Sequence, residues 1–531
     1  MKNKLLLFLF AMLTSASLMA QEEPSTTNDN TAVETTDGPT GSADEANAIN
    51  NTLDVLSSMD SVNQFAGNLG YNYIGGEHYV TLRLKPEITL GKWGVGLDIP
   101  LSVNVENGKF RSEEFKNGVG ALRMIRYVRY GVKKRDPFHI QVGDMSNSYI
   151  GYGMLVNNYT NATSFERRKV GLGWDVRFGK VAGLEGMYSD FNVKSFNLLA
   201  VRPYVRPFGN LPVPVIRTFE IGGTYVGDRD KTVENGLEVQ HNLLMQNKGI
   251  NSYGADAGIS LINLRFLRLR AYGQFAKLDK KVSIGELTAY NVQHMTAANN
   301  ELPTEDQITE EDIATNARNQ AIELAKKRPE YEGVDDADFE NGYTAFEGGQ
   351  GYSYGIELQA SLIFKLLTAS AKIERVNYER NFIPQFFNSI YEINKDARIL
   401  ALANVTEPTK GIYGSVSATL LEKVRLSGAL MLPDEIGENA PAMVNVNAEV
   451  VNLFDKIILN AHYIKGNLLS LDNAFTFDEN SLAVARAAYK LNRFLTVGVD
   501  YQWTWQQVGE GQFKPSNRVM PYFGFNFPLN L

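Results

Sequence analysis

The chain has 531 residues, of which 44% are hydrophobic and 21% are charged, and none is cysteine. The absence of cysteine excludes a disulfide framework, a thiolate nucleophile and a Cys-ligated zinc or iron–sulfur site. A formal net charge of −8 gives no basic field for a nucleic-acid backbone, so nucleic acid is not expected as a partner.

The N-terminal part of the chain predicts export. An apolar run at 5–13 follows lysines, is too short to cross a bilayer and is followed by polar residues, which predicts a signal peptide at 1–20. Residues 21–46 are rich in Thr, Ser, Asp and Glu and predict a disordered acidic linker. Residues 47–66 carry apolar side chains at helical spacing, which predicts a short amphipathic helix. Its apolar stripe would cover either a barrel lumen, as a plug, or a periplasmic partner.

From residue 67 onward the dominant period is two. Between 79 and 90, one face is apolar and the other is polar; the apolar face carries Val80, Leu82, Leu84, Ile88 and Leu90. The same alternation returns at 95–104, 170–178, 352–362 and 495–506. Such segments run about 10 to 13 residues, which is long for a soluble strand and matches a tilted strand that crosses a bilayer. The pattern therefore favours a membrane barrel over a soluble sandwich.

The connections between these segments alternate between short and long. Short turns are predicted at 91–93, 133–137, 179–180, 264–265, 365–366, 422–423, 455–456 and 492–493. Long loops are predicted at 105–118, 145–166, 227–250, 281–349, 380–410, 433–441, 466–480 and 507–516. Bacterial outer-membrane barrels place tight turns on the periplasmic side and long loops outside. We therefore predict, for 67–531, a closed antiparallel transmembrane β-barrel of about 18–20 strands in the outer membrane of a Gram-negative bacterium, surrounded by outer-membrane lipid. Residues 67–77 are either its first strand or a lead-in.

The last segment, 519–531, alternates apolar and aromatic residues on one face. It resembles the C-terminal strand signal of outer-membrane proteins, which implies the barrel-assembly machinery as a partner during insertion.

Four stretches resemble a known group of proteins: IRYVRYG at 125–131, VGDMSNSYIGYGMLVNNYTN at 142–161, FERRKVGLGWDVRFG at 165–179 and VRPYVRPFG at 201–209. They are similar to uncharacterised outer-membrane β-barrel proteins of Bacteroidetes-type Gram-negative bacteria. The resemblance covers about residues 67–280. It implies location and fold and transfers no functional residue.

The residues offer little for catalysis. The five histidines, His78, His139, His241, His294 and His462, show no metal-ligand spacing. No G-x-S-x-G element, Walker A sequence or dinucleotide-binding fingerprint occurs. We therefore expect no catalytic residue, no enzyme activity, no cofactor and no His-based metal site.

Arginines on the polar faces are more informative, because a charge that faces lipid at the bilayer midplane costs about 2 to 4 kcal/mol. The predicted lumen-lining residues are Arg202, Tyr204, Arg206, Arg268, Arg270, Tyr272 and Glu357. One interpretation is a basic ladder that attracts anionic solutes. The other is that the arginines pair with carboxylates of other strands and fill the lumen; the candidates are Glu87, Asp98, Asp175, Glu185, Glu220 and Glu357.

The 281–349 loop is strongly acidic. Residues 301–350 contain fourteen acidic and four basic residues, a net charge of −10 in a chain of −8. Residues 309–327 predict a helix, with Thr309 as its cap and acidic residues in its first turn. This helix would constrict the pore, offer a partner site or remain a solvated loop element. Asp336, Asp338, Glu340 and Glu347 fit ligand positions of a calcium loop, but the required glycine is displaced.

Two functions remain open. A porin-like or transport channel for hydrophilic or amphiphilic solutes would select them by lumen charge and by the 281–349 loop. A non-conducting scaffold barrel would instead bind unknown periplasmic or surface partners.

Overall fold

The computed structural model describes residues 64–74, 77–112, 124–162, 169–191, 196–235, 238–301, 307–362, 366–392, 394–421, 423–437, 440–509 and 512–528. The predicted signal peptide, the acidic linker and most of the helix at 47–66 lie outside the described residues. The end of that helix prediction is wrong, because residues 64–66 belong to a β-strand.

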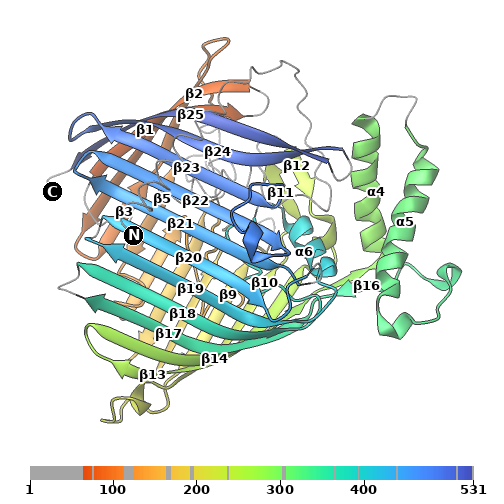
Figure 1. Ribbon diagram of the computed structural model, residues 1–531, viewed down its shortest axis with the longest axis horizontal. Helices are drawn as coiled ribbons and strands as arrows, with labels where there is room; N and C mark the ends of the chain where they lie inside the picture. Colours follow the sequence, from red (N-terminus) through yellow and green to blue (C-terminus); the bar gives the residue numbers. More distant parts are fainter. Residues whose placement is uncertain are drawn as a thin grey trace. The chain divides into compact units, whose positions relative to one another are not determined.

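The described strands form one antiparallel barrel wall (Figure 1). The first strands along the chain are β1 (Gln64–Ile74), β2 (Glu77–Leu90), β3 (Trp93–Leu97), β4 (Ile99–Asn104), β5 (Ile125–Tyr130), β6 (Phe138–Gly143), β7 (Gly171–Phe178), β8 (Ala182–Tyr188), β9 (Leu199–Val205) and β10 (Glu220–Asp228). They are followed by β13 (Ile250–Asn263), β14 (Leu267–Asp279), β17 (Gln350–Leu362), β18 (Leu367–Tyr378), β19 (Thr409–Leu420), β20 (Val424–Pro433), β21 (Ala442–Leu453), β22 (Ile457–Leu468), β23 (Ser481–Lys490), β24 (Leu495–Gly509) and β25 (Gln512–Pro528).

The wall closes on itself. β25 pairs with β1 from Gln64↔Pro528 to Leu69↔Phe523. β3 and β4 both pair with β2 and form two pieces of one barrel strand. The predicted fold class is therefore confirmed as a closed antiparallel barrel of 20 strands, and residues 67–74 belong to its first strand. Closure joins the first barrel strand to the last and so pairs the two edges that an open sheet would expose to lipid.

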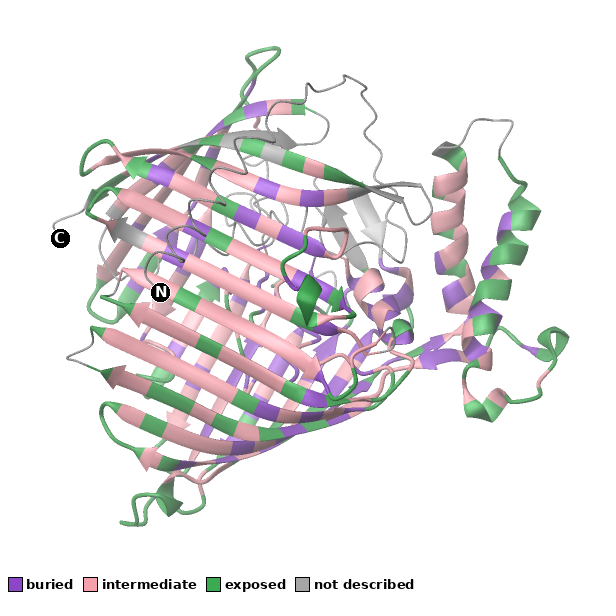
Figure 2. Ribbon diagram, viewed as in Figure 1, coloured by how far each residue is buried: buried purple, intermediate pink, exposed green. Residues whose placement is uncertain are grey.

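The alternation along each strand separates an apolar outer face from a polar inner face. On β19, Ile412, Val416 and Leu420 point outward and are 46%, 58% and 47% exposed. Tyr413 and Ser415 lie on the inner face of the same strand. Figure 2 shows the resulting mixture of exposed and partly buried residues along the strands, with buried residues gathered toward their loop ends. The outer face thus has the polarity that hydrocarbon requires.

Aromatic side chains mark both ends of the barrel wall. At the turn end, Trp93 contacts Tyr130 with ring centroids 5.1 Å apart, and Phe494 stacks on Phe527 at 5.0 Å. At the loop end, Tyr225 packs against Tyr253 at 5.7 Å. Two such aromatic girdles are typical of barrels that span a bilayer. Among the described residues, no helix is long and apolar enough to cross a membrane.

Most connections lie where the sequence predicts them, with one error and two omissions. The predicted loop at 507–516 is wrong, because β24 and β25 continue to pair up to Gly509↔Gln512. The loop between the end of β8 at Tyr188 and the start of β9 at Leu199 was not predicted. A longer turn-side connection at 206–219, which contains the 3-10 helix η2 (Ile216–Thr218), was not predicted either. Alternating polarity identifies the body of a strand, but extended backbone pairing can continue past the apolar residues.

The long loops carry the remaining elements. These are β11 (Thr232–Asn235), β12 (Glu238–His241), η3 (Leu243–Met245), β15 (Lys281–Ser283), α4 (Ile284–Glu301), α5 (Glu310–Lys326), η4 (Pro329–Tyr331), η5 (Asp336–Asp338), β16 (Thr344–Glu347), α6 (Lys395–Asn404) and η6 (Leu471–Asn473). The predicted helix at 309–327 is confirmed as α5, and the Thr309 side chain accepts a hydrogen bond from the Asp312 backbone N–H. The α4–α5 hairpin stands on the β15–β16 ribbon, beyond the loop ends of the strands (Figure 1).

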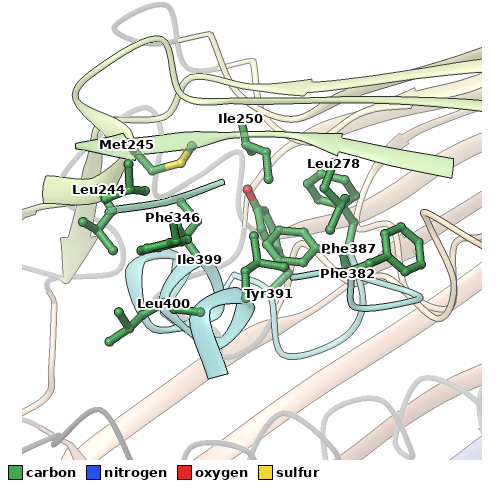
Figure 3. Close-up of a cluster of buried hydrophobic side chains, with 14 of the residues drawn as sticks. Leu244, Met245, Ile250, Leu278, Phe346, Phe382, Phe387, Tyr391, Ile399 and Leu400 are labelled. Carbon is green, nitrogen blue, oxygen red and sulfur yellow. The ribbon is translucent and has the colours of Figure 1, made fainter. Parts of the chain in front are cut away.

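The main hydrophobic core lies among the loops (Figure 3). Phe387 and Tyr391 from the loop after β18 pack with Leu244 and Met245 from the loop after β10. Val156, from the loop after β6, forms a parallel bridge with Phe387. We call the described parts of 144–162, 229–249 and 379–408 the loop cap. Burial of its aromatic side chains stabilises this packing, at about 25 cal/mol per Å² of apolar surface removed from water.

Candidate functional site in the barrel lumen

One part of the loop cap is anchored to inward-facing residues on distant parts of the wall. The Gly151 backbone N–H donates to Glu185 Oε1 at 3.0 Å, and Glu185 lies on β8. The Lys372 ammonium, on β18, donates to the Tyr152 carbonyl at 3.3 Å. These two contacts attach residues 149–152 to two separate parts of the wall, β8 and β18, so the segment crosses the lumen. We call residues 149–152 the constriction segment.

Aromatic packing fixes the same segment. The Tyr152 ring stacks on Tyr272 of β14, with centroids 4.5 Å apart and planes 7° from parallel. The Tyr272 hydroxyl donates to Glu374 at 2.6 Å, and the Arg270 guanidinium lies 5.8 Å from the Tyr152 ring centroid. Gly151 has φ +61°, a conformation that glycine adopts without steric cost, and a Cβ there would approach the Arg202 side chain to 3.1 Å.

The β5–β6 turn reaches the constriction segment from the opposite end of the barrel. The Lys133 ammonium donates to the Tyr149 carbonyl at 2.6 Å, and Lys134 Nζ lies 3.0 Å from Glu185 Oε2. The Lys134 backbone N–H also donates to Asp175 Oδ2 on β7 at 2.8 Å. A turn and a loop therefore meet at Glu185, and together they fill this side of the lumen.

Arg202 is the centre of the charges in this region. It is 1% exposed and pairs with Glu185 at 2.9 Å, with Glu220 at 2.9 Å and with Asp256 at 2.5 Å. Arg206 pairs with Glu220 at 2.7 Å, and the Tyr204 ring contacts the guanidinium groups of both arginines. A buried guanidinium is stable only when carboxylates neutralise it. The structure therefore shows ion-paired filling at these positions.

The other predicted lumen residues lie on β14 and β17. Arg270 Nη1 is 4.0 Å from Glu357 Oε2, and Tyr272 is buried beneath Tyr152. Arg268 is exposed at the turn end of β14, and its guanidinium has no hydrogen bond or ion pair with another residue in the described part of the chain. A continuous ladder of unpaired arginines is therefore not present among the predicted positions.

The calcium-loop interpretation is wrong. Glu347 pairs with Lys281 at 3.3 Å and with Arg328 at 3.2 Å. Asp336 pairs with Lys326 at 2.5 Å. Asp338 ends η5 and Glu340 follows it, and the described residues contain no group of three or more His, Asp or Glu side chains that could hold a metal ion. Glu347 therefore pairs with basic side chains and does not join the other three carboxylates.

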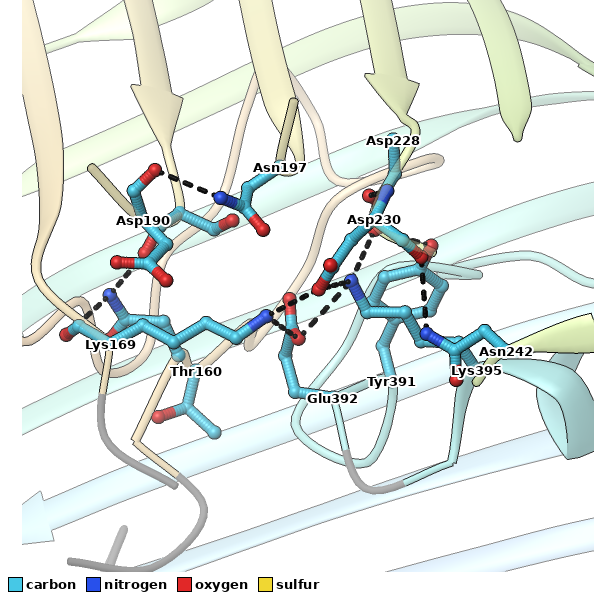
Figure 4. A network of polar contacts seen from close by, with 12 residues as sticks. Thr160, Lys169, Asp190, Asn197, Asp228, Asp230, Asn242, Tyr391, Glu392 and Lys395 are labelled. Carbon is cyan, nitrogen blue, oxygen red and sulfur yellow. Dashed lines mark hydrogen bonds and ion pairs between the residues drawn. The ribbon is translucent and has the colours of Figure 1, made fainter. Parts of the chain in front are cut away.

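A buried polar network joins the loop cap to the end of β10 (Figure 4). The Lys395 ammonium lies 2.7 Å from Asp228, 3.1 Å from Asp230 and 3.4 Å from Glu392. Lys169 pairs with Glu392 at 2.7 Å and with Asp230 at 3.0 Å. Burial alone lowers the pKa of Lys395, but the carboxylates of Asp228, Glu392 and Asp230 raise it well above its usual range. Both lysines therefore stay charged and hold the three chain segments together.

Sequence reasoning missed the constriction segment and this network. Their contacts join residues far apart in the chain, as in Lys169 with Glu392 or Tyr152 with Lys372, so no local spacing reveals them. The run GYGM at 151–154, with two positive-φ glycines, is the one local signal of a tightly folded loop.

No protein-family model matches the chain, and a comparison with curated proteins finds no relative. Among solved structures, the chain is similar to Wzi, an outer membrane protein of Escherichia coli involved in group 1 capsule assembly and a carbohydrate-binding β-barrel. That match has 11% identity and covers 92% of this chain and 89% of Wzi, at a TM-score of 0.34. The ferric-catecholate import receptor Fiu of E. coli K12 matches at 9% identity over 88% of this chain and 82% of Fiu, with a TM-score of 0.33.

The outer membrane protein OpdK of Pseudomonas aeruginosa is a third similar structure. It matches at 11% identity over 87% of this chain and 97% of OpdK, with a TM-score of 0.30. TM-scores this low carry no argument about ligand or activity. What the site can do follows from its own geometry: a barrel this wide encloses an aqueous channel unless it is filled, and one side of this lumen is filled.

Proposed function

We propose that this protein is a transport barrel in the outer membrane of a Gram-negative bacterium and passes small polar solutes through a constricted lumen. The observation that carries the proposal is the constriction segment, which is anchored by Glu185 and Lys372 on opposite sides of it. A loop held inside a wide barrel narrows the passage and brings solutes into contact with lumen side chains.

The outer surface supports the membrane location. Apolar side chains such as Val416 and Leu426 face outward along the wall, and aromatic groups lie near both ends. The inner face remains polar on β18 and β19, where Ser370 and Ser417 lie 2.8 Å apart and only partly buried. This combination is that of a membrane barrel with a hydrated interior.

The lumen charges favour size and hydrogen bonding over net charge as the basis of selection. Arg202, Arg206 and Arg270 each lie within 4.0 Å of a carboxylate. Paired charges produce a weaker long-range field than a single-sign ladder. We therefore expect weak ion selectivity at the constriction segment.

Conductance in a planar bilayer tests the proposal. Ser148 and Tyr159 are antiparallel bridge partners, so residues 149–158 can be replaced by a short Gly-Ser turn between them. Wild type should give small discrete currents, and the shortened loop should give clearly larger ones because the obstruction is gone. A matched control shortens the α4–α5 hairpin, which stands outside the strand ends, and should leave the current unchanged.

A non-conducting scaffold is the second candidate, and the loop cap favours it. Phe386, Phe387 and Tyr391 are fully buried at the loop end, above the Lys395 network. If wild type and the shortened loop are both well folded and neither conducts, the transport proposal fails and the scaffold function remains.

A further inference from the structure

We propose that the turn end of the lumen holds a binding site for a small anionic solute, at the inner face of β14, β17, β18 and β19. The site goes beyond the transport proposal, because binding there does not require conduction. A cavity of about 340 Å³ lies between the β13–β14 turn and the inner faces of these strands. That volume is at the lower end of the range for small-molecule sites.

The register of four strands places polar side chains of this cavity in rows. Arg268 lies opposite Gln359, Gln359 lies opposite Ser370, and Ser370 lies opposite Ser417. One step nearer the turns, Thr368 pairs with both Ser361 and Thr419. Because side chains alternate across a strand, these residues all point to the lumen. The rows form a continuous polar surface of amide and hydroxyl groups with a guanidinium at one end.

The charge of the lining has one sign. Arg265 and Arg268 line the cavity, and no Asp or Glu lines it. The nearest acidic side chain on β17, Glu357, is already engaged: it accepts from Gln359 at 2.6 Å and lies 4.0 Å from Arg270. In the described part of the chain, neither Arg265 nor Arg268 has an ion-pair partner.

The contrast with other lumen arginines is the argument for a ligand. Arg202 and Arg206 pair with carboxylates, and so do Arg83 with Asp98 at 2.6 Å and Arg486 with Asp500 at 2.6 Å. At those four arginines the chain supplies its own anion, whereas at this cavity the guanidinium groups of two arginines are available to a bound one.

The chemistry defines the ligand class. A guanidinium binds a carboxylate or a phosphate through paired N–H···O hydrogen bonds. The hydroxyl groups of Thr368, Ser370 and Ser417 add neutral donors and acceptors that suit a hydroxylated solute. The site therefore fits a sugar-sized solute that carries one carboxylate or phosphate group.

Calorimetric titration of the full-length barrel in detergent tests the site, with glucose 6-phosphate, gluconate and glucose as probes. At least one anionic probe should bind, with an affinity about 10-fold or more above that of glucose, and binding should weaken as salt increases. Whichever anionic probe binds more tightly distinguishes phosphate from carboxylate. Equal binding of all three probes, or no binding of either anion, would overturn the proposal.

Single substitutions locate the binding. Arg268→Gln should weaken anion binding about 10-fold, and Arg265→Gln, in the turn, should also weaken it. The matched control is Arg425→Gln, because Arg425 lies near the turn end of β20 but pairs with Glu449 at 3.2 Å. Equal losses of anion binding in Arg425→Gln and Arg268→Gln would overturn the proposed site. A heat-modifiable band on a gel establishes folding of each variant, and the salt dependence of the wild type tests the site independently of them.

Discussion

The part of the wall from β5 to β10 and the part from β17 to β25 follow the same alternating pattern but differ in how their inward-facing polar side chains are satisfied. Strands β5 to β10 have 6 to 9 residues, and their inward charges, such as Glu185 and Arg202, are buried and paired. Strands β17 to β25 have 10 to 17 residues. Inward side chains on β18 and β19, such as Lys372 and Ser415, are only partly buried.

This difference links the length of the strands to how far the lumen beside them is filled. Where the strands are short, the turn at 131–137 and the loop at 144–162 fold inward and supply partners for the buried charges. Where the strands are long, the turns are tight and the 379–408 loop packs at the loop end, so the inner faces of β18 and β19 near the turns stay only partly buried. A polar inner face therefore allows both a filled and a hydrated lumen.

The largest expected effect lies in the filled region. Arg202→Gln leaves Glu185, Glu220 and Asp256 without their shared cation and should destabilise the barrel by about 3–5 kcal/mol. Arg425→Gln breaks a half-exposed pair and should cost about 1 kcal/mol or less. Urea unfolding in detergent measures both. Equal costs would show that the two regions do not differ in charge burial.

The next effect compares the two faces of one strand in the long-strand region. Val416→Arg places a charge on the outer face of β19 and should hinder folding into bilayers by about 2–4 kcal/mol. Ser415→Arg, the adjacent inner-face position, should be tolerated because a partly hydrated lumen can solvate a charge. Folding into liposomes, followed on a gel, checks this pair. Tolerance at both positions would contradict the assignment of faces.

A smaller effect is expected on the stability of the loop cap as pH changes. Burial raises the pKa of Asp396 to about 6, although its carboxylate accepts from the Leu243 and Leu244 backbone N–H groups and Lys280 and Lys395 lie nearby. Because the pKa in the folded state lies above the ordinary value of 3.8, the folded state binds the proton more tightly. The stability that Asp396 contributes is therefore present at low pH and is lost as pH rises from about 4 to 6.

Protease cleavage within 379–408 should accordingly increase as pH rises through that window, after correction for protease activity. Asp396→Asn does not titrate and should flatten the dependence. Glu392 does not produce the same slope, because Lys169 and Lys395 lower its pKa against the effect of burial. An unchanged slope in Asp396→Asn would assign the pH dependence to another group.

The smallest expected effect on barrel folding comes from removal of the α4–α5 hairpin. Ser283 pairs with Thr344 in the β15–β16 ribbon, so a tight Asn-Gly turn can replace residues 284–343. The shortened protein should still form a heat-modifiable barrel, because surface loops tolerate large changes at small entropic cost. Loss of the folded band would show that core residues of the hairpin, such as Leu287 and Ile322, are needed for the loop cap and the wall.

The sequence by itself determined the repeating parts of the molecule. Strand polarity, tight turns and the capped helix α5 depend on residues close together in the chain, so periodicity and capping reveal them. The same reasoning failed at 507–516, where pairing between β24 and β25 extends the strands past their apolar residues. It also failed at residues 64–66. These residues end a stretch with apolar side chains at helical spacing, but they form part of β1 because they pair with β25.

Only the tertiary structure decided what fills the lumen. Whether an inward arginine is paired depends on which strand or loop lies opposite: Arg202 meets Asp256 across 54 residues of chain, whereas Arg268 meets Gln359. The constriction segment likewise depends on Lys372, 220 residues away from Tyr152 in the chain. Alternation specifies the face of each side chain, but the partner is set by barrel closure and loop folding, which no local spacing records.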